Sequence, residues 1–201
     1  MSARSMARPA LFFIIASACS SSLSSFKTTW LNPSTAPVEM TGKKVVVVAI
    51  NLPNTMRMGV EAAVADELRV LGAHAIGSYQ VLPLANTVES AKAKLYAEGV
   101  DSAFVFHIVD NEQKLWVKPG TDAPGKIQSY WEWGGGWGDG MSAEISTKTP
   151  MYVETLVYSV RRDQLAWSGV SVSTNPEDVG SFCRELVRSA VSAMKRTGRL
   201  I

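Results

Sequence analysis

Apolar and polar positions along this chain follow two periods, and each period predicts a different kind of element. Residues 44–50 (KVVVVAI) are almost continuously β-branched, which is typical of a strand covered on both faces. Residues 101–110 (DSAFVFHIVD) are apolar at odd and even positions alike, so they predict a second central strand. Between these two runs, helical spacing of apolar residues predicts a helix that ends at Gly72. Its apolar face comprises Val60, Val64, Leu68 and Leu71.

The stretches between and after these elements continue the alternation of strands and helices. Residues 74–82 (HAIGSYQVL) predict another strand. The capping-box spacing of Asn86 and Glu89 predicts a short helix that runs to Glu98. Residues 112–117 are expected to return as a hairpin partner of the strand before them.

The C-terminal part predicts a hairpin followed by a long amphipathic helix. Residues 151–160 and 165–174 are strand-like, and the polar residues 161–164 form the turn between them. Asn175 is the expected cap of the last helix. The buried stripe of that helix comprises Val179, Phe182, Leu186, Ala190, Ala193 and Met194. The order β-α-β-α-β, then hairpin and helix, predicts one α/β domain over residues 43–201, a mixed sheet flanked by helices.

The first residues of the chain are organised as a secretory signal. Residues 1–9 carry two arginines and no acid, residues 10–18 (ALFFIIASA) are almost entirely apolar, and Cys19 follows at once. This apolar run is far shorter than the ~20 residues that span a bilayer. A plain secretory signal cut near Ala18 and an N-terminal membrane helix are the alternatives, but neither explains a cysteine at this position.

The end of this signal, ASAC at residues 16–19, resembles the lipobox of bacterial lipoproteins, with Ala16 where that family usually has Leu. In that family the cysteine thiol receives a diacylglyceryl group, the peptide is cut before the cysteine, and the new amine is acylated. The resemblance therefore implies a signal peptide over residues 1–18 and a lipid anchor at Cys19. In the same family a residue of the type of Ser20 is associated with release to the outer membrane, which implies a location on its periplasmic side.

Removal of the signal changes the charge of the chain. The full sequence has 20 basic and 18 acidic residues, and loss of the two arginines in residues 1–18 leaves 18 of each. A mature protein without net charge lacks the electrostatic footprint of a nucleic-acid binder, so we expect no nucleic-acid partner.

Residues 19–42 follow the signal and are rich in Ser, Thr and Pro. They predict an acylated cysteine and a tether, and the apolar residues Phe26, Trp30 and Leu31 indicate that the second half of the tether packs on the domain. With Cys19 acylated, the remaining cysteine cannot form an internal disulfide. We expect this second cysteine, Cys183, to be a buried thiol of the last helix.

A segment rich in glycine and tryptophan lies between the central strand and the C-terminal hairpin. Within a long loop expected over residues 119–150, the stretch YWEWGGGWGDGM holds three of the six tryptophans. Its aromatic side chains are candidate contacts for a glycan or a protein partner. These candidates are Tyr130, Trp131, Trp133 and Trp137. A twisted hairpin whose aromatic residues cover the sheet, and a disordered segment, are the alternatives.

Candidate chemistry elsewhere is sparse. Arg57, beside Asn54 and Thr55 at the start of the first helix, is a candidate for holding an anion, because ligands of α/β sheets bind beyond strand carboxyl ends. An ordinary polar loop is the alternative. His107 lies on a buried strand and is expected to be a hydrogen-bonded core residue, whereas His74 is expected to be solvated. Nucleophile-elbow, zinc-protease and paired-cysteine motifs are absent, so we predict no cofactor, metal or catalytic residue.

Several segments together resemble a group of uncharacterised bacterial lipoproteins: KVVVVAI, RMGVEAAVADELRVLGAHAIGSYQVLP, AEGVDSAFVFHIVD and YVETLVYSVRRDQLAWSG. The C-terminal part is similar to a lipoprotein domain of unknown function, in which a Gly-rich aromatic segment precedes a strand ending in Trp-x-Gly, here residues 167–169. The element order also looks like the small α/β domain of the TolB amino-terminal region and of the curli-secretion lipoprotein. Neither group supplies catalytic residues.

Two hypotheses about function follow. The leading one is a non-enzymatic outer-membrane lipoprotein whose α/β module binds an envelope protein, peptidoglycan or another copy of itself. The alternative is a periplasmic enzyme acting on a cell-wall or lipid substrate, with His107 or Glu132 as acid or base.

Overall fold

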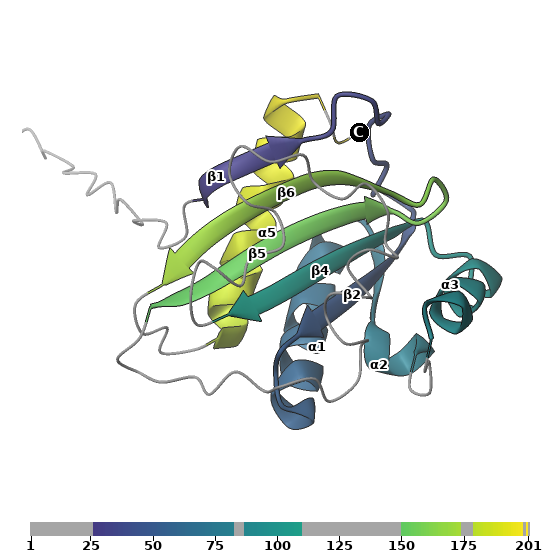
Figure 1. Ribbon diagram of the computed structural model, residues 1–201, viewed down its shortest axis with the longest axis horizontal. Coiled ribbons are helices and arrows are strands. Elements are labelled where there is room, and N and C mark those ends of the chain that lie inside the picture. The colour runs from purple at the N-terminus through teal and green to yellow at the C-terminus, as the bar shows by residue number, and fades with distance from the viewer. Residues whose placement is uncertain (1–25, 83–86, 110–149, 174–178, 199, 201) are drawn as a thin grey trace, which may run out of the picture.

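The computed structural model of the chain describes residues 26–82, 87–109, 150–173, 179–198 and 200. Figure 1 shows a single β-sheet with two long helices behind it and shorter helices at one side. The strands are β1 (Phe26–Leu31), β2 (Lys44–Ile50), β3 (His74–Gly77), β4 (Ser102–Val109), β5 (Met151–Ser159) and β6 (Gln164–Ser173). The helices are α1 (Asn54–Val70), α2 (Ser78–Val81), α3 (Val88–Ala97) and α5 (Val179–Arg196).

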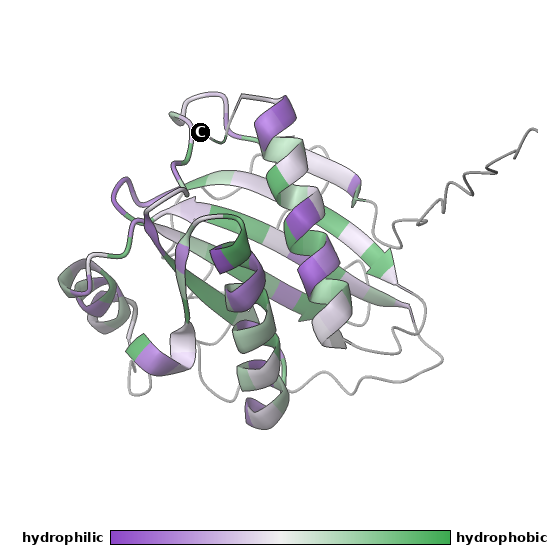
Figure 2. Cartoon of the chain, turned by 180° about the vertical axis from the view of Figure 1, so that it is seen from behind, coloured by the Kyte–Doolittle hydropathy of each residue, from purple (hydrophilic) through white to green (hydrophobic). Residues whose placement is uncertain are grey.

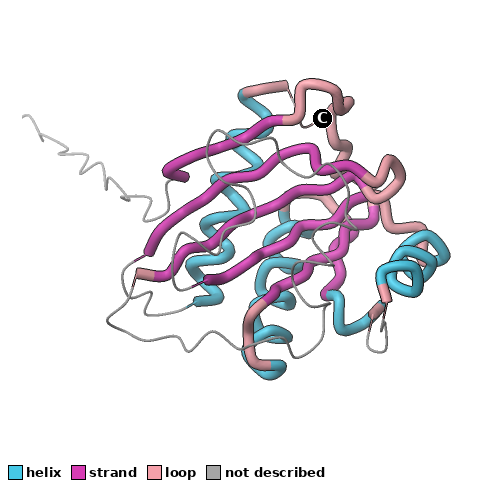
Figure 3. The backbone as a smooth tube through the Cα atoms, viewed as in Figure 1, coloured by secondary structure: helices cyan, strands magenta, loops and turns pink. Residues whose placement is uncertain are grey.

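Within the described residues, the strands form one 6-stranded sheet in the order β1-β6-β5-β4-β2-β3, which Figure 3 shows as a single layer. β2 pairs in parallel with β3 and with β4, whereas β4, β5, β6 and β1 pair antiparallel. Parallel strands need a crossover connection and antiparallel neighbours need only a turn, so helices follow β2 and β3 while β5 and β6 join directly. The α/β class and the mixed sheet predicted from the sequence are confirmed.

The two faces of the sheet bury alternate residues of each strand. On one face, Phe104 of β4 belongs to the same buried cluster as Leu68 of α1 and Leu186 of α5. Figure 2 shows these two helices side by side across that face. On the other face, Val105 packs in a cluster with Leu95 of α3. Every residue of β4 is buried, which confirms it as a central strand.

An ion pair joins the two long helices on the outside of the core. The Nε and Nη2 atoms of Arg188 on α5 donate to the two carboxylate oxygens of Glu67 on α1, at 2.6 and 2.8 Å. Glu67 is buried although Arg188 is exposed. The Arg188 guanidinium holds the pKa of this carboxyl below its ordinary value. The pair therefore fixes the packing of α1 against α5 by a bidentate contact.

The sheet begins earlier in the chain than the sequence indicated. Residues 26–31, expected to belong to the tether, form β1 and pair with β6 at the edge of the sheet. The ring of Phe26 meets Trp167 edge-on, with centroids 5.0 Å apart and an interplanar angle of 84°. Gly169 makes room for this contact, because a Cβ there would lie 2.5 Å from Trp167 and 2.6 Å from Phe26. The sheet therefore includes residues 26–31, which the sequence pattern assigned to the tether.

The sequence predicted a strand over residues 74–82, and this prediction is wrong for the residues after Gly77. β3 ends there, and residues 78–81 form the short helix α2. The backbone leaves the sheet because the Ser78 hydroxyl and the Tyr79 N–H both donate to a carboxylate of α1 instead of continuing the strand.

Helix boundaries follow the predicted signals with one difference. α3 is capped by Thr87, whose side-chain oxygen accepts from the Ser90 N–H at 3.1 Å, and the predicted cap Asn86 lies outside the described residues. The hairpin turn after β5 is confirmed, with Asp163 in the left-handed region at φ 51°. The predicted strand at 112–117 and the cap at Asn175 also lie outside the described residues.

The stripe predicted for the last helix faces the core. Phe182, Leu186, Ala190 and Met194 are buried, and Ala193 is half-buried. Cys183 is buried on the same helix, as expected. Of the side chain of Val179 the structure gives no description.

Candidate functional site

A buried carboxylate, Glu61 of α1, ties together the carboxyl ends of β2 and β3. Its Oε1 accepts from the Ala49 N–H at 3.0 Å and from the Ser78 hydroxyl at 2.7 Å. Its Oε2 accepts from the Tyr79 N–H at 3.3 Å. Burial raises the pKa of the Glu61 carboxyl, because the loss of hydration disfavours the ionised form more than these donors favour it. The acceptor oxygens of Glu61 are therefore engaged inside the domain.

Arg57, predicted to hold an anion with Asn54 and Thr55, lies one helical turn before this carboxylate. Its Nη1 is 4.0 Å from Glu61 Oε1 and donates to the Ser78 hydroxyl at 3.4 Å. Asn54 and Thr55 are exposed at the start of α1. An anion bound to Arg57 would lie next to the Glu61 carboxyl, which already accepts hydrogen bonds within the domain. An anion site here stays a prediction.

His107 and Glu154 form a second buried polar pair near the end of β4. They are direct cross-strand partners of β4 and β5, and the Nδ1 of His107 lies 3.1 Å from the Oε2 of Glu154. The His107 and Glu154 side chains are 4% and 0% exposed, so the pair lies in the interior of the domain. The expectation that His107 is a hydrogen-bonded core residue is confirmed. His74 is exposed, also as expected.

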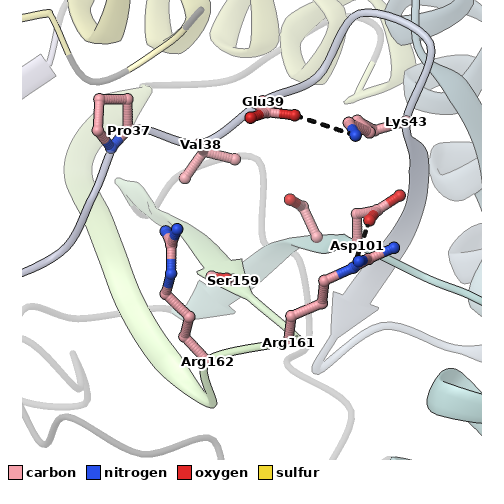
Figure 4. Close-up of a pocket in the computed structure, with 9 residues that line it drawn as sticks. Pro37, Val38, Glu39, Lys43, Asp101, Ser159, Arg161 and Arg162 are labelled. Carbon is pink, nitrogen blue, oxygen red and sulfur yellow. Dashed lines mark ion pairs between the residues drawn. The ribbon is translucent and has the colours of Figure 1, made fainter.

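A cavity of about 280 Å³ opens at the opposite end of the sheet, where β4 begins and β5 ends (Figure 4). Three segments enclose it: residues 37–43 before β2, residues 101–102 at the start of β4, and residues 159–162 at the β5–β6 turn. We call it the basic pocket. Its polar lining consists of Glu39, Lys43, Asp101, Ser102, Ser159, Arg161 and Arg162.

Ion pairs neutralise part of the charge in the basic pocket. The Nε of Arg161 donates to Asp101 Oδ1 at 2.7 Å, and the other oxygen of Asp101 accepts from the Lys44 N–H at 3.1 Å. The Nζ of Lys43 pairs with Glu39 at 3.0 Å. Arg162 makes no ion pair or hydrogen bond through its side chain with any residue of the chain that the structure describes. Three bases against two acids leave a lining charge of +1.

Two small residues, Ser102 and Ser159, form the inner wall of the basic pocket. They are direct partners in the β4–β5 ladder and are 2% and 8% exposed. Neither hydroxyl makes a hydrogen bond to a described residue. The cavity therefore exists because two short side chains face a covering segment whose buried residue, Val38, does not fill the space.

The sequence interpretation missed the basic pocket. It treated residues 161–164 as a polar hairpin turn and residues 37–42 as the end of a tether. The available signal was the Arg161-Arg162 pair at a tight turn, but nothing in the sequence shows that the turn faces Lys43 and the start of β4.

Other predicted site residues lie outside the described residues: Cys19, Tyr130, Trp131, Glu132, Trp133 and Trp137. In the part of the chain that the structure describes, three or more His, Cys, Asp or Glu side chains nowhere gather in a way that could hold a metal ion. None of the described helices combines the length and apolar character that a membrane span needs.

Neither a family model nor a curated protein sequence matches the chain. Its fold is similar to that of the PelC dodecamer from Paraburkholderia phytofirmans, with 14% identity, a TM-score of 0.43, and coverage of 89% of this chain and 99% of that chain. A PelC variant from the same organism has 15% identity, a TM-score of 0.46, and coverage of 81% and 96%. The lipoprotein GNA1162 from Neisseria meningitidis has 13% identity, a TM-score of 0.40, and coverage of 80% and 97%. We infer nothing about function from similarity at these levels.

Proposed function

We propose that this chain is a lipid-anchored lipoprotein of the bacterial cell envelope that binds a partner and catalyses no reaction. The observation that carries the proposal is the distance along the chain between the lipobox cysteine and the fold. Residues 20–25 alone separate Cys19 from β1. A fully extended segment of this length reaches roughly 20 Å, so an acylated Cys19 would keep the start of β1 close to the membrane surface.

This short connection would orient the domain. The first residue of β1, Phe26, pairs with Ser171 near the end of β6. The basic pocket lies beyond the opposite end of the same strand, at the β5–β6 turn. Because β6 has 10 residues, the two ends are about 30 Å apart. The pocket would therefore face away from the membrane, where soluble and cell-wall partners of a periplasmic protein are found.

A binding role fits the use of polar groups in the described residues. Glu61 and the His107–Glu154 pair are buried and hydrogen-bonded within the domain, whereas the basic pocket is open and keeps unused donors. Partners suited to such a module are an envelope protein, peptidoglycan or a second copy of the chain. The aromatic segment around Trp133 is proposed as a second contact for such a partner.

The anchor is tested by replacing each cysteine in turn and fractionating the cells. The wild-type chain should be recovered in the outer membrane, and mass spectrometry should find an acylated Cys19 as its first residue. Cys19→Ala should lose the acyl chains and the cleavage before residue 19, because no thiol remains to be lipidated. Cys183→Ala, the matched control, should remain acylated. An unmodified N-terminus in the wild-type chain would refute the anchor.

Partner contact is tested by crosslinking in intact cells followed by mass spectrometry. The triple variant Trp131→Ala, Trp133→Ala, Trp137→Ala should lose the crosslinked partner while its circular dichroism stays unchanged. Equal recovery of the partner by the wild-type and triple-variant chains would remove the aromatic segment from the proposal.

A further inference from the structure

We propose that the basic pocket binds a compact oxyanion, a carboxylate or phosphate group, and that Arg162 is the main residue that binds it. The inference rests on the proposed binding role and adds the chemistry of what is bound. Three observations on described residues support it: the guanidinium of Arg162 has no ion pair, the hydroxyls of Ser102 and Ser159 have no hydrogen bond, and all three residues line one cavity.

Arg162 is the cation in the pocket that has no internal partner among the described residues. Figure 4 shows its side chain extending from the β5–β6 turn toward the segment that carries Pro37 and Val38. A guanidinium presents parallel N–H donors that match the two oxygens of a carboxylate or phosphate. An unpaired fork beside a cavity is therefore suited to receive such a group.

Arg161 has a different role in the same pocket. Its Nε is held by Asp101, whose second oxygen is held in turn by the backbone N–H of Lys44. Figure 4 shows the Arg161 guanidinium directed at Asp101. Arg161 thus neutralises the Asp101 carboxylate, which would otherwise repel an anion. The positive charge of Arg162 is then not offset by an acid in the pocket lining.

The inner wall supplies neutral donors. The hydroxyls of Ser102 and Ser159 form no hydrogen bond to a described residue, although both residues are more than nine-tenths buried. Neither hydroxyl oxygen is shut off from the cavity, so both are accessible as donors to a bound oxygen acceptor. The volume of about 280 Å³ is just below the range of about 300–1,000 Å³ that is usual for ligand pockets, which favours a small group over an extended chain.

The protein as purified from cells in detergent micelles, acylated or not, provides the test, by isothermal titration with sodium phosphate and with sodium acetate at low ionic strength. We expect saturable binding of at least one anion, and the arm that binds distinguishes a phosphate from a carboxylate ligand. Arg162→Ala should weaken binding by about tenfold or more, because a charge-assisted bidentate contact is lost. The anion affinity of Arg162→Lys should lie between those of wild type and Arg162→Ala, since lysine keeps the charge but lacks the paired N–H donors of a guanidinium.

Two further variants separate the pocket from general charge effects. Glu39→Gln releases Lys43 from its ion pair and removes one acid from the lining, so it should strengthen binding by about threefold to tenfold. Arg196→Ala, which removes an exposed arginine at the end of α5, should leave the affinity unchanged.

Equal affinities for wild type and Arg162→Ala, or heats that never saturate in the wild type with either anion, would overturn the assignment. Failure of the anchor is a separate result. If Cys19 is not acylated but Arg162→Ala still loses the anion, the pocket stands and the envelope location falls.

Discussion

The two ends of the sheet use their polar side chains in opposite ways. At the carboxyl ends of the parallel strands, several described polar groups form buried hydrogen bonds with one another, as in Glu61 with Ser78 and His107 with Glu154, although the Nε of Arg57 is buried there without a described partner. At the other end, in the basic pocket, Arg162 and two serine hydroxyls have no partner among the described residues. One end is built mainly as a buried hydrogen-bond network, and the other has unused donors that line an open cavity.

The proposed anion site would reverse the usual position of ligand sites in α/β sheets. Ligands of such sheets bind beyond the carboxyl ends of parallel strands, where loops and helix starts gather. In the described part of this chain, Glu61 accepts from the Ala49 and Tyr79 N–H groups at the carboxyl ends, and the basic pocket lies at the amino end of β4. We therefore place the proposed site by the unused hydrogen-bonding groups of the described residues rather than by fold class.

The largest loss of stability is expected from removal of Glu61, the hydrogen-bond acceptor at the carboxyl ends of β2 and β3. Glu61→Ala leaves the buried donors of Ala49, Ser78 and Tyr79 without their acceptor, so it should lower the free energy of unfolding by about 2–4 kcal/mol. Urea denaturation measures this. Asp66→Ala on the exposed side of the same helix is the control and should cost about 0.5 kcal/mol or less. A loss for Glu61→Ala as small as that of the control would show that the network is dispensable.

The edge strand near the proposed anchor depends on a glycine. A Cβ at Gly169 would overlap Trp167 and Phe26, so Gly169→Ala should displace β1 and cost about 1–3 kcal/mol. Gly59→Ala is the matched control, since nothing lies within 4 Å of a Cβ there. As an exposed helix position it should gain about 0.5–1 kcal/mol. Thermal unfolding compares the two variants, and a neutral Gly169→Ala would mean that β1 packs independently of this contact.

The two buried acids of α1 should give opposite pH dependence. The pKa of Glu67 is lowered by Arg188, so its contribution to stability is complete above 4.5 and is lost as the pH falls through the folded-state value. The pKa of Glu61 is raised by burial, so its contribution is complete below 4.5 and is lost as the pH rises through the folded-state value. Both effects should be smaller than the loss from Gly169→Ala.

Unfolding free energies of Glu67→Gln and Glu61→Gln, measured from acid to neutral pH, separate these contributions. Relative to wild type, Glu67→Gln should become less damaging as the pH falls below 4.5. Glu61→Gln should become less damaging as the pH rises. Parallel profiles for the two variants would contradict the assigned causes of the pKa shifts.

The smallest effect on stability is expected at the open end. Arg162→Ala removes no internal contact of a described residue, so it should change the free energy of unfolding by less than about 0.5 kcal/mol while anion binding falls. Urea denaturation and titration of the same preparation check both parts. A large loss of stability would show that Arg162 has a structural role and would remove the contrast between the two ends.

Much of the fold could be predicted because its signals are local. The β-branched run of β2, the two apolar faces of β4 and the stripe of α5 each fall within one stretch of sequence, and the structure confirms all three. The strand β1 could not be found in this way. All 6 of its residues are half-buried or exposed, and its pairing depends on Trp167 and Gly169 far along the chain.

The end of β3 illustrates the same limit on a smaller scale. Residues 78–81 have strand-like composition, but hydrogen bonds from Ser78 and Tyr79 to Glu61 on a preceding helix turn them out of the sheet. A local pattern carries no information about where that carboxylate lies.

By itself, the sequence determined the α/β class, the burial of the last helix and the presence of a lipobox-like cysteine, because periodicity and short motifs are properties of neighbouring residues. Only the tertiary structure decided which polar groups neutralise one another. Arg57 lies beside a buried acid, whereas Arg162 faces a cavity without an internal partner among the described residues. The reason is that Coulombic and hydrogen-bonding energies depend on distances in space, and folding sets those distances between residues far apart in the chain.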